Sequence, residues 1–151
     1  MTSVKMVERA LDILLVEDNE DHAELTQQAL ADGNVSNRIY WVRDGQQALD
    51  FLFQRGVYHG QQAPGLILLD INLPKVTGVE VLRKIKEDER LRVIPVIMLT
   101  TSDRGEEAYR CYSFGANSFV TKPVKFIEFF EKVRSLKFYW LLTDRGPNSG
   151  G

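Results

Sequence analysis

Short segments rich in aliphatic, β-branched and aromatic residues alternate along this chain with longer segments whose apolar residues recur every three or four positions. The short segments cover residues 13–16, 38–42, 66–69, 95–99 and 118–121. Several of them are continuously apolar and end in charge, a pattern typical of strands covered on both faces of a sheet. Five predicted strands that alternate with predicted helices indicate an α/β domain with a parallel sheet.

Helix-capping residues stand between the strands and the periodic segments. Asn19 can cap the first helix, whose inner face carries Ala23, Thr26, Ala29 and Leu30. Asp44, Thr77 and Asp103 are each followed three residues later by Gln or Glu, the capping-box pattern. A last helix is predicted over 125–142. We interpret its apolar stripe as core packing, with a partner surface as the alternative; the stripe is Phe126, Phe129, Phe130, Val133, Leu136 and Trp140.

Composition narrows the class of protein. The 151 residues are 44% hydrophobic and 26% charged with a net charge of −2, which predicts one globular domain and no nucleic-acid binding through bulk charge. The single cysteine, Cys111, cannot form an internal disulfide. No apolar run approaches the roughly 20 residues of a membrane span. We therefore expect a cytoplasmic protein with an N-terminal extension over 1–10, a folded domain over 11–142 and a disordered tail over 143–151.

Chemically active side chains stand at the carboxyl ends of four predicted strands. In a parallel sheet these ends share one edge, where ligands bind. The residues are Glu17, Asp18, Asp70, Thr100, Thr101 and Lys122. Three carboxylates roughly 5 Å apart repel by about 3 kcal/mol per pair at an effective dielectric near 20, so the cluster needs a cation or its carboxyls must take up protons. Its ligands are oxygens, with no Cys or His expected nearby, and this favours Mg²⁺.

Asp70 is the candidate nucleophile of this edge. Carboxylates form acyl phosphates, and phosphoryl transfer needs mainly positioning and charge neutralisation. The cation and the ammonium of Lys122 would supply the neutralisation. The sequence therefore predicts a phosphoryl acceptor.

Four motifs carry a resemblance to the receiver domains of two-component response regulators. They are Leu-Val-Glu-Asp-Asn (15–19), Leu-Leu-Asp-Ile-Asn-Leu-Pro (68–74), Met-Leu-Thr-Thr (98–101) and Val-Thr-Lys-Pro (120–123). The match covers about residues 11–142. The resemblance implies a flavodoxin-like, doubly wound sheet of five parallel strands in the order 2-1-3-4-5 with five helices.

The resemblance also implies roles for the acidic residues. Asp70 would take a phosphoryl group from a phosphohistidine on a sensor histidine kinase or a phosphotransfer protein. Asp18 matches the acid that binds Mg²⁺ directly, and Glu17 matches its neighbour, which acts through water. The backbone carbonyl of Asn72 matches the third protein ligand of the metal, and Lys122 matches the lysine that pairs with the phosphoryl group.

The remaining matched positions concern the switch. Thr100 matches the hydroxyl that bonds the phosphoryl group, and Phe119 matches the aromatic ring that turns inward when the switch engages. Asn72 and Ser102 match the two variable positions that tune phosphoryl lifetime. The resemblance implies a cis bond before Pro123.

Two further features resemble a subfamily. A loop near Gly56-Val-Tyr-His-Gly and a long last helix ending Phe138-Tyr-Trp-Leu-Leu are similar to single-domain regulators paired with bacterial phytochrome kinases. We expect a homodimer through the last helix. Because little sequence follows the receiver, output would act through a downstream protein target or by passing the phosphoryl group onward. The chain would assist its own phosphorylation and dephosphorylation rather than act as an enzyme on other substrates.

Three alternatives remain open from the residues alone. A phosphatase of the haloacid-dehalogenase type would carry a second acid at position 72, where this chain has Asn72, which cannot shuttle a proton. A flavodoxin-like carrier would place a phosphate where Glu17 and Asp18 put negative charge. A receiver that binds partners without being phosphorylated would leave the acceptor residues unused.

Overall fold

The computed structural model describes residues 12–35, 37–101 and 110–135. Its five strands form one parallel sheet in the order β2-β1-β3-β4-β5. The strands are β1 (Ile13–Val16), β2 (Ile39–Val42), β3 (Leu66–Asp70), β4 (Val96–Thr100) and β5 (Ser118–Thr121). This arrangement confirms the predicted flavodoxin-like class and strand order.

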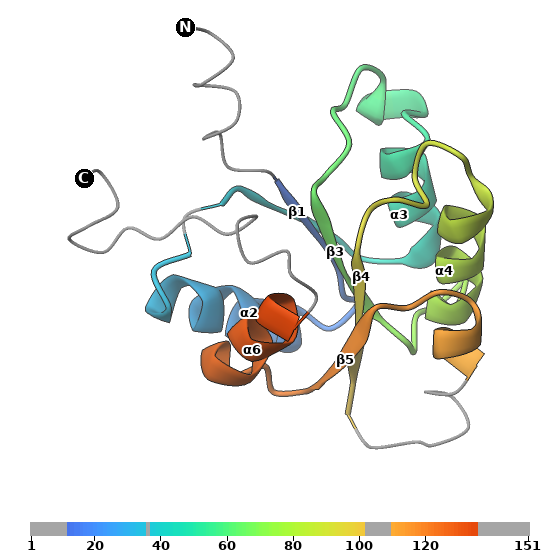
Figure 1. The fold of residues 1–151 in the computed structure, drawn as a ribbon. Helices are drawn as coiled ribbons and strands as arrows, with labels where there is room; N and C mark the ends of the chain where they lie inside the picture. Colours follow the sequence, from blue (N-terminus) through green and yellow to red (C-terminus); the bar gives the residue numbers. More distant parts are fainter. Residues whose placement is uncertain (1–11, 36, 102–109, 136–151) are drawn as a thin grey trace, which may run out of the picture.

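Helices cover both faces of the sheet. Helices α2 (Glu20–Asp32) and α6 (Phe126–Ser135) lie on one face, and α3 (Gly45–Leu52) and α4 (Gly78–Glu87) lie on the other (Figure 1). Residues 110–113 are also helical, and a short 3-10 helix, η1, spans Gly56–Tyr58. None of the described helices is both long and apolar enough to cross a membrane.

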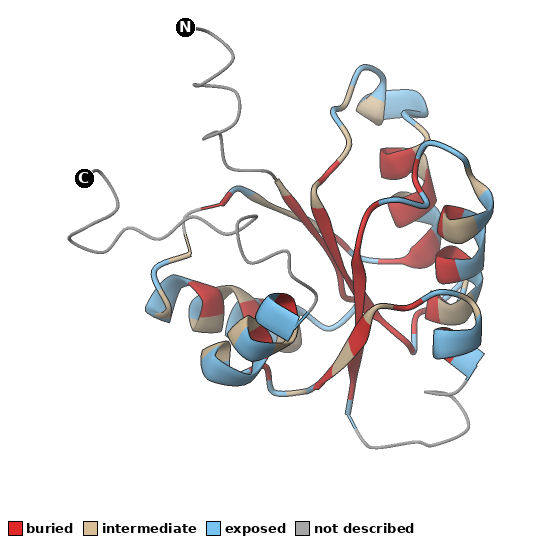
Figure 2. Cartoon of the chain, viewed as in Figure 1, coloured by how far each residue is buried: buried red, intermediate tan, exposed pale blue. Residues whose placement is uncertain are grey.

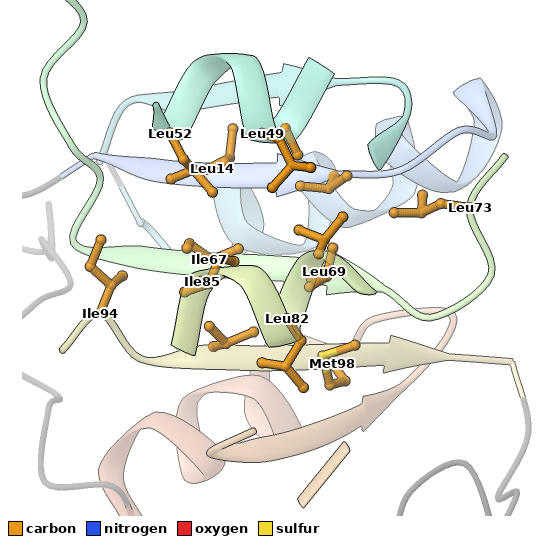
Figure 3. Packing of buried hydrophobic residues seen from close by; sticks show 14 of the residues in the cluster. Leu14, Leu49, Leu52, Ile67, Leu69, Leu73, Leu82, Ile85, Ile94 and Met98 are labelled. Carbon is orange, nitrogen blue, oxygen red and sulfur yellow. The ribbon is translucent and has the colours of Figure 1, made fainter. Parts of the chain in front are cut away.

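The strands are buried on both faces, which explains their continuous apolar runs. Leu14, Ile67 and Leu69 face α3 and α4, where they pack with Leu49, Leu52, Leu82 and Ile85 (Figure 3). Their neighbours Leu15 and Leu68 belong to the opposite cluster, which includes Phe129 and Val133 of α6. The central strands are accordingly buried along their whole length (Figure 2).

The predicted caps are present at three helices. The side chains of Asn19, Asp44 and Thr77 accept hydrogen bonds from the backbone N–H groups three residues later, at donor–acceptor distances of 3.0, 2.8 and 3.2 Å. The fourth predicted cap, Asp103, lies outside the described residues. So do the predicted extension over 1–10, the tail over 143–151 and the end of the last helix.

Element boundaries differ from the expectations by one or two residues, for local reasons. Strand β4 begins at Val96 rather than Pro95, because proline has no N–H to contribute to the ladder. Helix α3 ends at Leu52 rather than near Gln54, since Gln54 takes a left-handed conformation with φ of 59°. In α6, Phe129 and Val133 are buried in the core, which confirms core packing for these two residues of the stripe. Phe126 and Phe130 are half-buried, and their rings stack on each other.

Candidate functional site

Three carboxylates meet at the carboxyl edge of the sheet. Strand β1 pairs with β3 so that Val16 lies beside Leu69, and the residues that follow these two positions are therefore neighbours. One carboxylate oxygen from each of Glu17, Asp18 and Asp70 lies within 4.8 Å of the others. Glu17 and Asp70 are buried and Asp18 is exposed.

An ammonium group bridges the two buried acids. Lys122 follows β5, and its Nζ donates to Glu17 Oε1 at 2.8 Å and to Asp70 Oδ2 at 3.1 Å. Its backbone N–H donates to the carbonyl of Thr100 at 2.7 Å, and the Lys122–Pro123 peptide bond is cis. The side chain is 6% exposed, so the charge acts in an environment that screens it little.

Burial and charge shift the acid–base behaviour of this pair. Burial raises the pKa of Glu17 to about 7, against the lowering effect of the hydrogen bond from Lys122 and with a further raising effect of the Asp70 charge. Burial also lowers the pKa of Lys122, but the hydrogen bonds and charges of Glu17 and Asp70 outweigh it, so the net shift is upward. Lys122 therefore stays protonated near neutral pH, whereas Glu17 titrates in that range.

Backbone donors hold the acids in place. The Asn72 N–H donates to Asp70 Oδ1 at 3.1 Å, and the Asn19 N–H donates to Glu17 Oε2 at 3.2 Å. The indole of Trp41 on β2 donates from Nε1 to the Glu17 carbonyl at 2.7 Å. The site is thus a set of oriented carboxylate oxygens, the donor type that suits a hard divalent cation such as Mg²⁺.

The sequence matches the response regulator receiver domain over residues 13–134. The chain belongs to the response regulator receiver domain family. Receiver domains accept a phosphoryl group on an aspartate in two-component signalling, from histidine kinases or phosphotransfer proteins, and they bind Mg²⁺ in an acidic pocket.

Individual relatives support the assignment along most of the chain. The probable methanogenesis regulatory protein FilR2 of Methanothrix harundinacea (strain 6Ac) is 46% identical over 136 residues, covering 89% of this chain and 86% of the relative. Response regulator Rcp1 of Synechocystis sp. (strain ATCC 27184 / PCC 6803 / Kazusa) is 39% identical over 131 residues, covering 87% of this chain and 89% of Rcp1.

Solved structures of response regulators also match this chain. The bacteriophytochrome response regulator AtBRR matches with a TM-score of 0.81 at 44% identity, covering 87% of this chain and 96% of that chain. The Mn²⁺-bound form of Rcp1 matches with a TM-score of 0.73 at 38% identity, covering 87% of this chain and 94% of that chain.

The position of His22 at this site was not predicted from the sequence. His22 Nδ1 lies 3.1 Å from Lys122 Nζ and 3.9 Å from Glu17 Oε2, so the expectation that no His stands near the acids was wrong. His22 lies in the first turn of α2, where its backbone N–H donates to the capping side chain of Asn19, and the packing of α2 on the sheet brings its ring to Lys122. The first turn of a helix that follows a strand end is the place where sequence reasoning could have found it.

The remaining matched residues of the receiver domain take these positions. Thr100 ends β4 and is buried, and Leu99 before it pairs with Asp70 in the sheet. Phe119 on β5 is half-buried and makes an edge-to-face contact with Tyr112, with ring centroids 4.7 Å apart. Ser102 lies outside the described residues.

Proposed function

We propose that Asp70 is the phosphoryl acceptor of this receiver domain and that the chain works as a Mg²⁺-dependent switch in a two-component or phosphorelay pathway. One observation carries the proposal: Lys122 Nζ bridges Glu17 and Asp70 at 2.8 and 3.1 Å, beside a third carboxylate within 4.8 Å. A buried nucleophilic carboxylate with a fixed cation and a place for a second one is the arrangement that phosphoryl transfer requires.

The transfer step uses groups that are already oriented. An oxygen of the Asp70 carboxylate attacks phosphorus while the P–N bond to the donor phosphohistidine breaks. The electron pair of that bond returns to the donor imidazole nitrogen, which takes up a proton from solvent. The product is an acyl phosphate on Asp70, and the ammonium of Lys122 balances the negative charge brought by the phosphoryl oxygens.

Mg²⁺ would be held by Asp18, Asp70 and the backbone carbonyl of Asn72, with Glu17 acting through water. The cation supplies charge neutralisation between the acids and the incoming phosphoryl group. The donor set fits, because all three side chains offer oxygen and the exposed Asp18 gives the ion access from solvent. The Asn72 N–H also fixes Asp70 Oδ1 at 3.1 Å.

The conformational change would begin at Thr100 and reach Phe119. In this proposal the Thr100 hydroxyl bonds the phosphoryl group, and the ring of Phe119 turns inward in response. Strands β4 and β5 are paired with Met98 beside Phe119, so a shift at the end of β4 reaches the neighbouring strand directly. Asn72 and Ser102 would tune the phosphoryl lifetime.

The partners follow from the same reasoning. We infer a sensor histidine kinase of the bacteriophytochrome class as phosphoryl donor, because AtBRR is a bacteriophytochrome response regulator. Output would act through a downstream protein, and a homodimer would form through the last helix. The chain would assist its own phosphorylation and dephosphorylation without turning over other substrates.

The test is phosphorylation by acetyl phosphate with Mg²⁺, measured by intact mass. We expect wild type to gain one phosphoryl group that hydroxylamine removes, since acyl phosphates react with it. Asp70→Asn should gain none. Asp21→Asn, which removes an exposed acid from the neighbouring first turn of α2, should behave like wild type. Modification of Asp70→Asn to the same extent, or no modification of wild type, would overturn the proposal.

A further inference from the structure

The ammonium of Lys122 has an acceptor for each of its three protons. Two are the carboxylate oxygens of Glu17 and Asp70, and the third is His22 Nδ1 at 3.1 Å. An ammonium only donates hydrogen bonds, so Nδ1 must accept and the ring proton must sit on Nε2. A proton on Nδ1 would place two donors, the ring N–H and the ammonium, face to face at this distance. The contact therefore belongs to one tautomer of a neutral imidazole.

The three acceptors are unequal. The side chains of Glu17 and Asp70 are 0% and 5% exposed, whereas that of His22 is 37% exposed. Bonds from an ammonium to a carboxylate are stronger than bonds to a neutral acceptor, and water can replace only the exposed partner. When a new acceptor arrives beside Lys122, the bond to His22 is the one that costs least to break.

The imidazole also has space to move. A pocket of about 190 Å³ adjoins the contact. It is lined by His22, Leu25, Thr26, Thr101, Lys122 and Pro123. Released from Lys122, the ring can rotate toward this pocket and solvent without disturbing the backbone, because the His22 N–H remains bonded to Asn19 in the cap of α2.

Building on the proposed function, we propose that His22 is a positioning residue for phosphoryl transfer. In the resting state its Nδ1 accepts the third hydrogen bond of the Lys122 ammonium. When Asp70 is modified, the ammonium donates this hydrogen bond to a phosphoryl oxygen instead, and the contact with His22 is lost. In the resting state the three acceptors fix the ammonium nitrogen beside Asp70. In the modified state the imidazole of His22 is free to move, which alters the surface between α2 and the end of β5. The presence or absence of the contact between His22 and Lys122 therefore indicates whether Asp70 is modified.

The first test reads the imidazole directly by long-range ¹H–¹⁵N NMR. The chain has two histidines, and the exposed His59 is an internal reference. We expect His22 to be in the Nε2–H tautomer in the presence of Mg²⁺ alone, and its resonances to shift when acetyl phosphate is added while those of His59 stay unchanged. The Nδ1–H tautomer in the resting protein, or an unchanged His22 in protein shown by mass to be phosphorylated, would overturn the proposal.

The second test separates positioning from a merely structural role. In His22→Asn an amide oxygen can accept from Lys122, whereas His22→Leu offers no acceptor. We expect acetyl phosphate to modify His22→Leu about three- to tenfold more slowly than wild type, which corresponds to the loss of one hydrogen bond of ordinary net strength, and His22→Asn to remain within about twofold of wild type. Glu24→Ala, an exposed position on the same helix, should match wild type. Equal rates for the Asn and Leu variants would overturn the proposal.

The two proposals fail in different ways. If wild type gains no phosphoryl group, the proposed function fails, and the displacement of His22 fails with it. If wild type is modified on Asp70 but His22 neither shifts nor affects the rate, only the role of His22 is lost. Thermal unfolding of every variant excludes a difference that arises from unfolded protein.

Discussion

The buried acids at the carboxyl edge of the sheet and the apolar interior beneath them have opposite energetics, although both are shielded from water. Leu15 and Glu17, two residues apart at the end of β1, are both 0% exposed. Burying a leucine side chain stabilises the fold by about 1.5–3 kcal/mol. Burying Glu17 removes a carboxylate from water, and the fold compensates with Lys122 and with a pKa raised to about 7. The interior stabilises the fold, whereas burying the reactive groups of the edge lowers its stability.

This contrast predicts that the two regions respond differently to substitution. Variants of the interior should lose stability while the folded fraction keeps its chemistry. Variants of the edge should lose chemistry or metal affinity with smaller losses of stability. The predictions below test that separation.

The largest effect on stability is expected at Phe129, a fully buried ring of α6 packed on the sheet. We expect Phe129→Ala to lower the free energy of unfolding by about 3–5 kcal/mol, because the ring is lost and a cavity remains. Chemical denaturation measures this change. Ile127→Ala, on the exposed face of the same helix, should change the free energy by less than about 0.5 kcal/mol.

The folded fraction of Phe129→Ala should be phosphorylated by acetyl phosphate at the wild-type rate. A large loss of phosphorylation at a temperature where the variant is folded would contradict the separation between interior and edge.

An intermediate effect is expected where the two regions touch. A Cβ added at Gly78 would lie 2.1 Å from the Asp70 carbonyl oxygen and 2.8 Å from Ile71 Cα, and neither backbone atom can move without shifting the end of β3. We expect Gly78→Ala to cost about 1–3 kcal/mol of stability and to slow phosphorylation, because the acceptor is displaced. Denaturation and intact mass measure the two effects.

The matched control is Gly45→Ala. Its Cβ would meet the Val76 carbonyl oxygen at 2.1 Å, a comparable overlap against a residue of the loop between β3 and α4. It should destabilise the protein similarly but slow phosphorylation less than Gly78→Ala does. The reverse order would mean that the position of the β3 end does not limit the reaction.

The same contrast explains what the sequence could and could not predict. The caps and the convergence of Glu17, Asp18 and Asp70 follow from local patterns and from the rule that parallel strands share an edge, whereas the strand order was implied by the resemblance to receiver domains. The burial of Glu17 beside an exposed Asp18 depends on how the chain leaves β1, which no apolar pattern encodes. The place of His22 depends on the rotation of α2 relative to the sheet.

Some predicted element boundaries were wrong for related reasons. The end of α3 is set by the positive φ of Gln54, a conformation uncommon for a residue other than glycine. The bond from Trp41 to the Glu17 carbonyl joins β2 to the residue after β1, and β-propensity alone would read that tryptophan as ordinary strand packing.

The last effect we expect is a pH dependence of Mg²⁺ affinity. Glu17 has a pKa of about 7 in the folded protein without metal, against 4.5 as its ordinary value. Between these values the folded state holds a proton that the unfolded state has lost, so the contribution of Glu17 to stability falls as pH rises through this window. A bound cation favours the carboxylate, so Mg²⁺ must release that proton below pH 7.

Calorimetric titration in two buffers of different ionisation enthalpy measures the proton release. We expect nearly one proton per Mg²⁺ well below pH 7 and almost none well above it, with an apparent affinity that falls about tenfold per pH unit on the acidic side. Glu17→Gln should bind more weakly at high pH and lose this dependence. An unchanged dependence in Glu17→Gln would assign the released proton to another group and would contradict the raised pKa of Glu17.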